Sequence, residues 1–205
     1  MLSQLFSPGK QRETVPVFPL QAVMVPGAVL PLRIFEVRYM DMARACLRER
    51  RPFGICLIRE GEEVGTPAAP EPVGCLARIG ECDMEELGIL KVRAEGLERF
   101  RIVSTEVTRQ GLIMGEIEEL LPEPVASGAA SLPECAGFLA MAIQGIGEAR
   151  FQQPLRFDDA TWVGFRLAEI LPMRNSVKQK LLELTDAELR LAVLHRFLRQ
   201  QKLVG

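Results

Sequence analysis

The stretch LPEPVASGAAS, residues 121–131, decides the fold, because the spacing of apolar residues changes across it. Its two prolines and its run of small residues are typical of a linker. Before this stretch, apolar residues alternate with polar ones, as they do in half-buried strands. After it, apolar residues recur every three or four positions, as they do on one face of a helix. The sequence therefore predicts an α+β protein and not an alternating α/β fold.

The first unit, residues 14–122, is predicted to be β-rich. Leu90, Val92 and Ala94 alternate with charged residues, which indicates a strand with one buried and one solvated face. Gly96 marks an expected turn between short strands. Short strands that follow one another as a meander favour a sheet rolled toward a barrel, because closure removes exposed edges.

The segments near the N-terminus first contain prolines in an extended stretch, and then the spacing of their apolar residues becomes helical. Residues 1–13 are polar and aperiodic, so we expect a flexible tail. The segment VPVFPL, residues 15–20, reads as an extended strand whose two prolines suit the edge of a sheet. Helical spacing starts at Glu36, and Arg51-Pro52 ends it, since the residue before a proline disfavours helix.

The second unit, residues 131–205, is predicted to be a helical subdomain that follows a linker at 123–130. Residues that cap helix N-termini with a side-chain oxygen divide this unit into four helices. The expected capping residues are Ser131 with Glu134, Asp158 or Asp159, Ser176 with Gln179, and Thr185 with Glu188.

Composition excludes several classes of protein. The chain has 205 residues, a formal net charge of −2 and a pI of about 5.7, which disfavours an obligate nucleic-acid binder. Five scattered cysteines and one histidine predict neither a disulfide framework nor a metal site, and we expect no cofactor. No secretion signal or membrane span is recognisable, so a reducing, cytoplasmic location is expected.

Catalytic constellations are not evident. No glycine-rich phosphate loop ending in Lys-Ser or Lys-Thr occurs. Ser176 and Lys180 have the spacing of a Ser-Lys pair on one helix face, but Ser176 also fits a helix cap, which we favour. His195 is the single histidine, and its apolar helical context predicts a structural or surface role. The sequence therefore predicts a protein that is not an enzyme.

Several motifs occur in an order that resembles the N-terminal substrate-recognition domain of Lon proteases, a family well represented in bacteria. The resemblance implies a PUA-like β pseudobarrel followed by a C-terminal helical subdomain, and a role in recognising substrate proteins. It extends from about Val15 to Leu198, so we expect a stand-alone form without ATPase and peptidase modules. The motifs that carry it are residues 17–20 (VFPL), 25–27 (VPG), 30–39 (LPLRIFEVRY), 53–54 (FG), 73–79 (VGCLARI), 95–100 (EGLERF), 181–184 (LLEL) and 190–191 (RL).

Two groups of residues within these motifs are the candidate sites. A dense apolar set in a loop-rich stretch is expected to be partly core and partly an exposed surface for polypeptides. Charged residues inside apolar motifs are expected to form structural ion pairs that tie the helix start to the barrel. The first group is Val23, Met24, Val25, Leu32, Ile34 and Phe35, and the second is Glu36, Arg38 and Arg99.

The leading functional hypothesis is a non-catalytic polypeptide-binding protein. Its expected partners are unfolded or client proteins, with a protease or chaperone as a further partner if the chain works as an adaptor in protein quality control. The alternative is a PUA-like RNA-binding protein. The acidic pI and the single tyrosine and tryptophan argue against it, because few aromatic platforms remain for base stacking.

Overall fold

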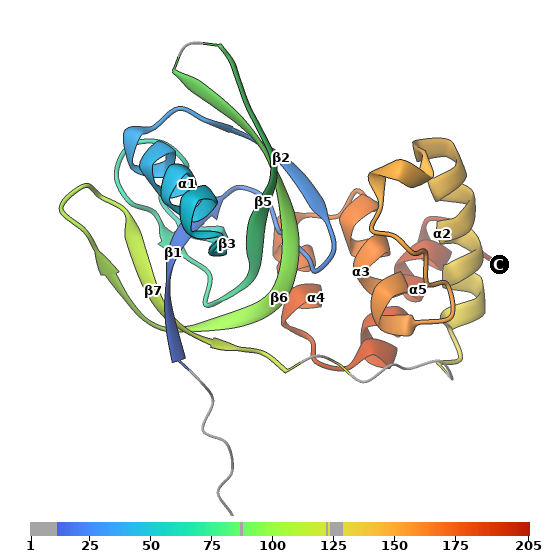
Figure 1. The fold of residues 1–205 in the computed structure, drawn as a ribbon. Helices are drawn as coiled ribbons and strands as arrows, with labels where there is room; N and C mark the ends of the chain where they lie inside the picture. Colours follow the sequence, from blue (N-terminus) through green and yellow to red (C-terminus); the bar gives the residue numbers. More distant parts are fainter. Residues whose placement is uncertain (1–11, 87, 122, 124–128) are drawn as a thin grey trace, which may run out of the picture.

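The computed structural model describes residues 12–86, 88–121, 123 and 129–205 (Figure 1). The strands are β1 Arg12–Leu20, β2 Val29–Ile34, β3 Phe53–Glu60, β4 Ala69–Pro70, β5 Val73–Glu86, β6 Ile89–Val107 and β7 Ile113–Glu119. The helices are α1 Val37–Glu49, α2 Leu132–Ile146, α3 Ala160–Ile170, α4 Asn175–Glu183 and α5 Ala187–Gln200, with a 3₁₀ turn η1 at Glu148–Arg150.

The strands form one sheet that closes on itself. Along the sheet the order is β1-β7-β6-β5-β3-β4, and an additional β1–β3 pairing completes a barrel, while β2 pairs with β6. The β1–β3 pairing is parallel, and the other pairings are antiparallel. Helices α2 to α5 lie together beside β2, β5 and β6 (Figure 1). The α+β prediction, a β barrel followed by a helical subdomain, is confirmed.

Strand β1 is not the edge strand that its prolines suggest. Residues 12–17 pair with β7 on one flank, and residues 17–20 pair with β3 on the other. Among the described residues, each half of β1 thus pairs with a strand on one flank only, and a proline is tolerated in a strand when its nitrogen faces such an unpaired flank. The strand begins at Arg12, inside the predicted tail, and residues 1–11 lie outside the described residues.

The expected turn at Gly96 is instead a point inside the long strand β6. The Gly96 N–H donates to the Ala28 carbonyl (2.8 Å), and the Gly96 carbonyl accepts from the Gly27 N–H (2.9 Å). Gly27 has φ +73°, so this is the pattern of a β-bulge with glycine in the left-handed conformation. A Cβ at Gly96 would lie 2.4 Å from the Val25 carbonyl oxygen, so a side chain there would displace the loop.

Apolar side chains fill the barrel and the helical unit. Leu90, Val92 and Ala94 are buried, as the alternation in this strand predicts. Phe165 of α3 and Leu182 of α4 belong to the same buried cluster as the barrel side chains, so the helical unit packs against the sheet. A second cluster around α2, α3 and α5 includes Leu139, Leu167, Leu191, Leu194 and Leu198.

Of the expected helix caps, one is confirmed and one lies a single residue further along the chain. Asp159 caps α3 by accepting from the N–H groups of Thr161 (2.9 Å) and Trp162 (3.4 Å), which confirms one prediction. Asp186, and not Thr185, caps α5, because its carboxylate accepts from the N–H groups two and three residues later. Ranking the two by residue type alone does not resolve this one-residue difference.

The predictions for Ser131 and Ser176 are wrong. Ser131 precedes α2 but already has helical backbone angles, and its side chain makes no capping hydrogen bond. Helix α4 begins at Asn175 after Arg174, so Ser176 lies inside the first turn. The Arg174 carbonyl accepts the first helical N–H bonds, from residues 177 and 178. Ser176 is therefore past the position from which a side chain can cap the helix.

Candidate functional site

A hollow of about 310 Å³ opens where the end of β1, strand β2, the start of α1 and the loop after β3 meet. We call it the β2–α1 hollow. Both strands converge here because Pro26-Gly27 turns the chain back onto β6. Its lining is mainly apolar and comprises Phe18, Leu20, Ala22, Leu30, Pro31, Leu32, Arg33, Ile34, Phe35, Glu36, Tyr39, Glu63 and Val64.

The six residues proposed from sequence to bind polypeptide separate into core and surface. Phe35 is 53% exposed and lies at the hollow, whereas Val23 is partly buried against the barrel core. Met24 is 2% exposed, so a charged residue there would test folding and not binding. The members that lie in the barrel core are Met24, Val25, Leu32 and Ile34, of which Leu32 and Ile34 also line the hollow.

A second exposed apolar residue at the hollow is Val64, which sequence reasoning missed. Its side chain is 55% exposed. Its loop is held near the hollow by two carboxylates: Glu63 accepts from the Gln21 N–H, and Glu36 Oε2 accepts from the Gly65 N–H at 3.3 Å. The only signal in the sequence is a single apolar residue in a loop of charged residues and glycines, which has no periodicity to interpret.

The predicted ion-pairing residues Glu36 and Arg38 contact each other at the start of α1. Arg38 Nη2 lies 2.9 Å from Glu36 Oε2, and Arg38 Nη1 donates to the Gly111 carbonyl at 3.1 Å. The Arg38 guanidinium also lies 4.7 Å from the centroid of the Tyr39 ring, which stacks on Phe18 at 4.0 Å. Burial raises the pKa of Tyr39, and the Arg38 charge opposes this rise. These contacts fix the wall of the hollow to the turn before β7.

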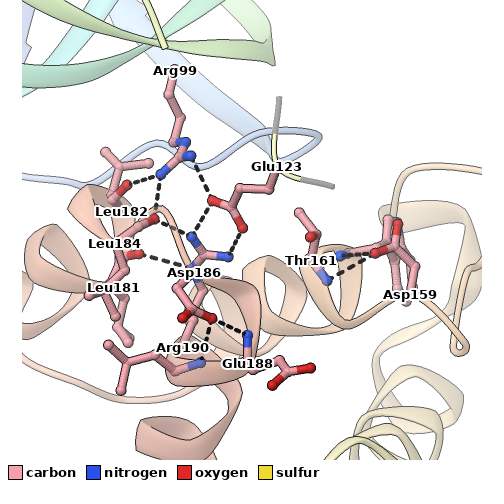
Figure 2. A network of polar contacts seen from close by, with 12 residues as sticks. Arg99, Glu123, Asp159, Thr161, Leu181, Leu182, Leu184, Asp186, Glu188 and Arg190 are labelled. Carbon is pink, nitrogen blue, oxygen red and sulfur yellow. Dashed lines mark hydrogen bonds and ion pairs between the residues drawn. The ribbon is translucent and has the colours of Figure 1, made fainter. Parts of the chain in front are cut away.

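Arg99, the third predicted ion-pairing residue, lies in a separate buried network between the sheet and the helices (Figure 2). Its Nη2 lies 2.6 Å from Glu123 Oε1. Its Nη1 donates to the carbonyls of Leu182 (2.7 Å) and Leu184 (2.6 Å) after α4. These acceptors and the Glu123 carboxylate allow Arg99 to be buried. Burial lowers the pKa of Arg99, and Glu123 opposes this effect.

Glu123 joins Arg99 to Arg190 of α5 (Figure 2). Arg190 Nη1 donates to Glu123 Oε2 at 2.7 Å, Nη2 contacts Glu123 Oε1, and Nε donates to the Leu181 carbonyl at 3.0 Å. The two guanidinium carbons lie 5.6 Å and 4.1 Å from the centroid of the Phe165 ring. We call Arg99, Glu123 and Arg190 the junction network. Glu123 lies between two prolines in the linker, and sequence reasoning missed it.

The catalytic candidates do not form catalytic pairs. Lys180 Nζ lies 2.7 Å from Glu183 Oε2, so its partner is a carboxylate and not the Ser176 hydroxyl. His195 Nε2 lies 2.7 Å from Glu134 Oε2, at the contact between α5 and α2. Within the described part of the chain, no group of three or more His, Cys, Asp or Glu side chains could hold a metal ion. The helices in that part are also too short or too polar to cross a bilayer.

Fold and site together define the class of protein: an α+β module that presents an apolar hollow on a barrel, which packs against a helical unit. Residues 14–200 match the family model of the ATP-dependent protease La (LON) substrate-binding domain, and the chain belongs to this family. The match covers most of the chain, which confirms the resemblance seen in the motifs.

Solved structures agree with this assignment. The Lon N-terminal domain protein from Xanthomonas campestris superposes with a TM-score of 0.75 and is 34% identical, over 89% of this chain and 96% of that one. The N-terminal domain of the Mycobacterium avium complex Lon protease shares the fold, with a TM-score of 0.67, 22% identity and the same coverage.

Protein cereblon from several vertebrates is among the curated proteins that this chain resembles. The Danio rerio protein is 28% identical over 123 residues, which is 56% of this chain and 28% of that protein. The Xenopus tropicalis protein is 28% identical over 117 residues, which is 55% of this chain and 25% of that protein. The matched region thus spans about a quarter of the length of these relatives.

Proposed function

We propose that the chain is a non-catalytic recognition module that binds protein substrates at the β2–α1 hollow and serves as an adaptor in protein quality control. The observation that carries this proposal is Phe35, a large apolar side chain that is 53% exposed beside the hollow. Membership in a substrate-binding domain family supports the same role. Unfolded proteins are the natural ligands for such a surface, because they expose the apolar side chains that it can cover.

The dimensions of the hollow set the expected affinity. Full burial of one Leu, Val or Phe side chain contributes about 1.5–3 kcal/mol, and association itself costs several kcal/mol. A hollow of about 310 Å³ accommodates only a few such side chains, so binding should be modest and tolerant of sequence. Pro31 stiffens β2 beside it, which reduces the chain entropy that binding must overcome.

Replacing Phe35 with Glu tests this surface. The substitution removes an exposed apolar side chain and adds a charge that a bound apolar segment would desolvate. We expect binding of a fluorescein-labelled, carboxymethylated unfolded protein to weaken by about tenfold, or about 1.4 kcal/mol. Circular dichroism should show an unchanged fold, because Phe35 is more exposed than buried.

Met141→Glu is the matched control. Met141 is 64% exposed on α2, in the helical unit and away from the hollow, so this variant should bind as the wild type does. A folded Phe35→Glu variant that binds unfolded protein as tightly as Met141→Glu does would rule out the β2–α1 hollow as the recognition surface.

A further inference from the structure

A second hollow, of about 560 Å³, lies at the opposite end of α1 and has a different chemistry. We call it the arginine hollow. Helix α1 has 13 residues, so at 1.5 Å per residue its two ends are about 20 Å apart. Leu47 and Ile79 contribute apolar surface to its lining, which also includes three arginines, Arg50, Arg51 and Arg78.

Arg50 occupies a backbone conformation that favours glycine. It ends α1 with φ +53° and ψ +37°, in the left-handed region, and its N–H donates to the Cys46 carbonyl. Glycine, and less often asparagine, usually fills this position because a Cβ there is strained. A strained residue at a surface site is a reason to look for a role of its side chain.

Arg50 also differs from its neighbours in its contacts. Arg78 Nε lies 2.7 Å from Glu95 Oε2. Arg51 Nη2 lies 3.6 Å from Glu13 Oε1, and Arg51 Nη1 lies 4.0 Å from Glu49 Oε2. The Arg50 side chain is exposed and has no hydrogen-bond or ion-pair partner among the described residues. Its guanidinium is therefore available to an external anion.

We infer that the arginine hollow is a docking surface for an acidic polypeptide segment, with Arg50 as the arginine that contacts an incoming carboxylate. A guanidinium offers two parallel N–H donors that match the two oxygens of a carboxylate. The aliphatic parts of a peptide would lie against Leu47 and Ile79. This surface goes beyond the proposed function, because it is separate from the β2–α1 hollow and recognises charge.

Charge and composition favour a peptide over a nucleic acid. The three arginines form a short cluster and not a continuous basic track, and Glu95 is part of the lining. Glu13 and Glu49 both lie within 4.0 Å of Arg51, so the positive charge of the hollow is local and does not form the extended track that a run of phosphates would need. Among the described residues that line the hollow none is aromatic, so they offer no platform for base stacking.

The test uses Arg50→Gly in the full chain. Glycine suits the left-handed conformation, so the thermal midpoint should stay the same or rise. The probe is a fluorescein-labelled peptide of alternating Glu and Gly, measured by anisotropy at low salt. Its dissociation constant should increase by about two- to fivefold, the effect of one exposed arginine–carboxylate pair. Arg50→Asn, which also tolerates this conformation, should give the same result.

Arg196→Ala is the control, since it removes one exposed positive charge from α5 and leaves the arginine hollow intact. It should bind the probe as the wild type does. A peptide with Gln in place of Glu should not bind, and added salt should weaken the acidic probe. Unchanged probe binding in Arg50→Gly, or an equal loss in Arg196→Ala, overturns the proposal. Arg50-dependent binding of a single-stranded oligonucleotide in place of the peptide also overturns it.

Binding at one hollow can be lost without loss of binding at the other. Arg50→Gly should leave capture of an uncharged unfolded segment at the β2–α1 hollow unchanged, because the substitution lies at the far end of α1. Phe35→Glu should in turn leave the acidic probe bound. A loss of both ligands in either variant would mean one shared surface and would contradict the separation inferred here.

Discussion

Replacing Glu123 with Gln should destabilise the protein strongly. The Glu123 side chain is 3% exposed and contacts two guanidinium groups, those of Arg99 and Arg190, which are 4% and 0% exposed. Glutamine keeps the shape but removes the negative charge, so two buried cations remain without a counterion. Breaking a buried pair in this way costs about 3–5 kcal/mol. That is a large part of the roughly 5–15 kcal/mol by which whole proteins are stable.

The assay is urea denaturation followed by circular dichroism at neutral pH. The free energy of unfolding of Glu123→Gln is compared with that of the wild type and of Glu95→Gln. Glu95 makes an ion pair of similar length, 2.7 Å to Arg78, but the two side chains are 37% and 66% exposed. Water and side-chain entropy reduce the value of such a pair to about 1 kcal/mol or less.

The comparison refutes the reasoning if the two variants lose similar amounts of stability. An equal loss would mean that burial does not increase the cost of removing the carboxylate. It would also mean that the junction network adds no more than a surface ion pair to the contact between sheet and helices. A loss of several kcal/mol in Glu123→Gln alone identifies this carboxylate as the counterion on which the contact depends.

Two further predictions concern caps and thiols. Asp159→Ala should lower the free energy of unfolding in urea by about 1 kcal/mol, because it removes the α3 cap. Ser176→Ala should change that free energy by no more than about 0.5 kcal/mol. The reverse order would contradict the cap assignments. Native protein should react quickly with dithiobis(nitrobenzoate) only at Cys82, the exposed cysteine, and all five should react after unfolding. Burial raises the pKa of Cys135 to about 12, so its thiolate is scarce near neutral pH. Fast modification of Cys135 in the folded protein would contradict the burial of this side chain.

Patterns that depend on near neighbours were predictable from the sequence. Leu90, Val92 and Ala94 share a face because side chains alternate along any strand, whatever that strand pairs with. The change of period across residues 121–131 likewise separates strands from helices without knowledge of their packing. These local signals were sufficient for the fold class, and they limited the α3 cap to Asp158 or Asp159, of which the structure shows Asp159.

Features that depend on distant partners could not be predicted in the same way. Strand β1 closes the barrel because it pairs with β3 and β7, and nothing within residues 12–20 specifies those partners. Arg99 is buried because its acceptors at Leu182 and Leu184 lie 83 and 85 residues later in the chain. The sequence indicated an ion pair for Arg99, but a sequence pattern contains no information about where its counterion lies.

In the β2–α1 hollow, too, the sequence did not show which single side chains are buried and which are exposed. Met24 and Phe35 both belong to apolar motifs, and composition does not distinguish the side chain that supports a surface from the one that forms it. The folded chain makes the distinction, because Met24 is buried in the barrel core, while Phe35 follows the end of β2 and is 53% exposed. A recognition surface needs exposed apolar atoms that a folded chain would otherwise bury. The paired Glu36 and Arg38 and the packed barrel core beneath Phe35 provide the rigid support that keeps such atoms exposed.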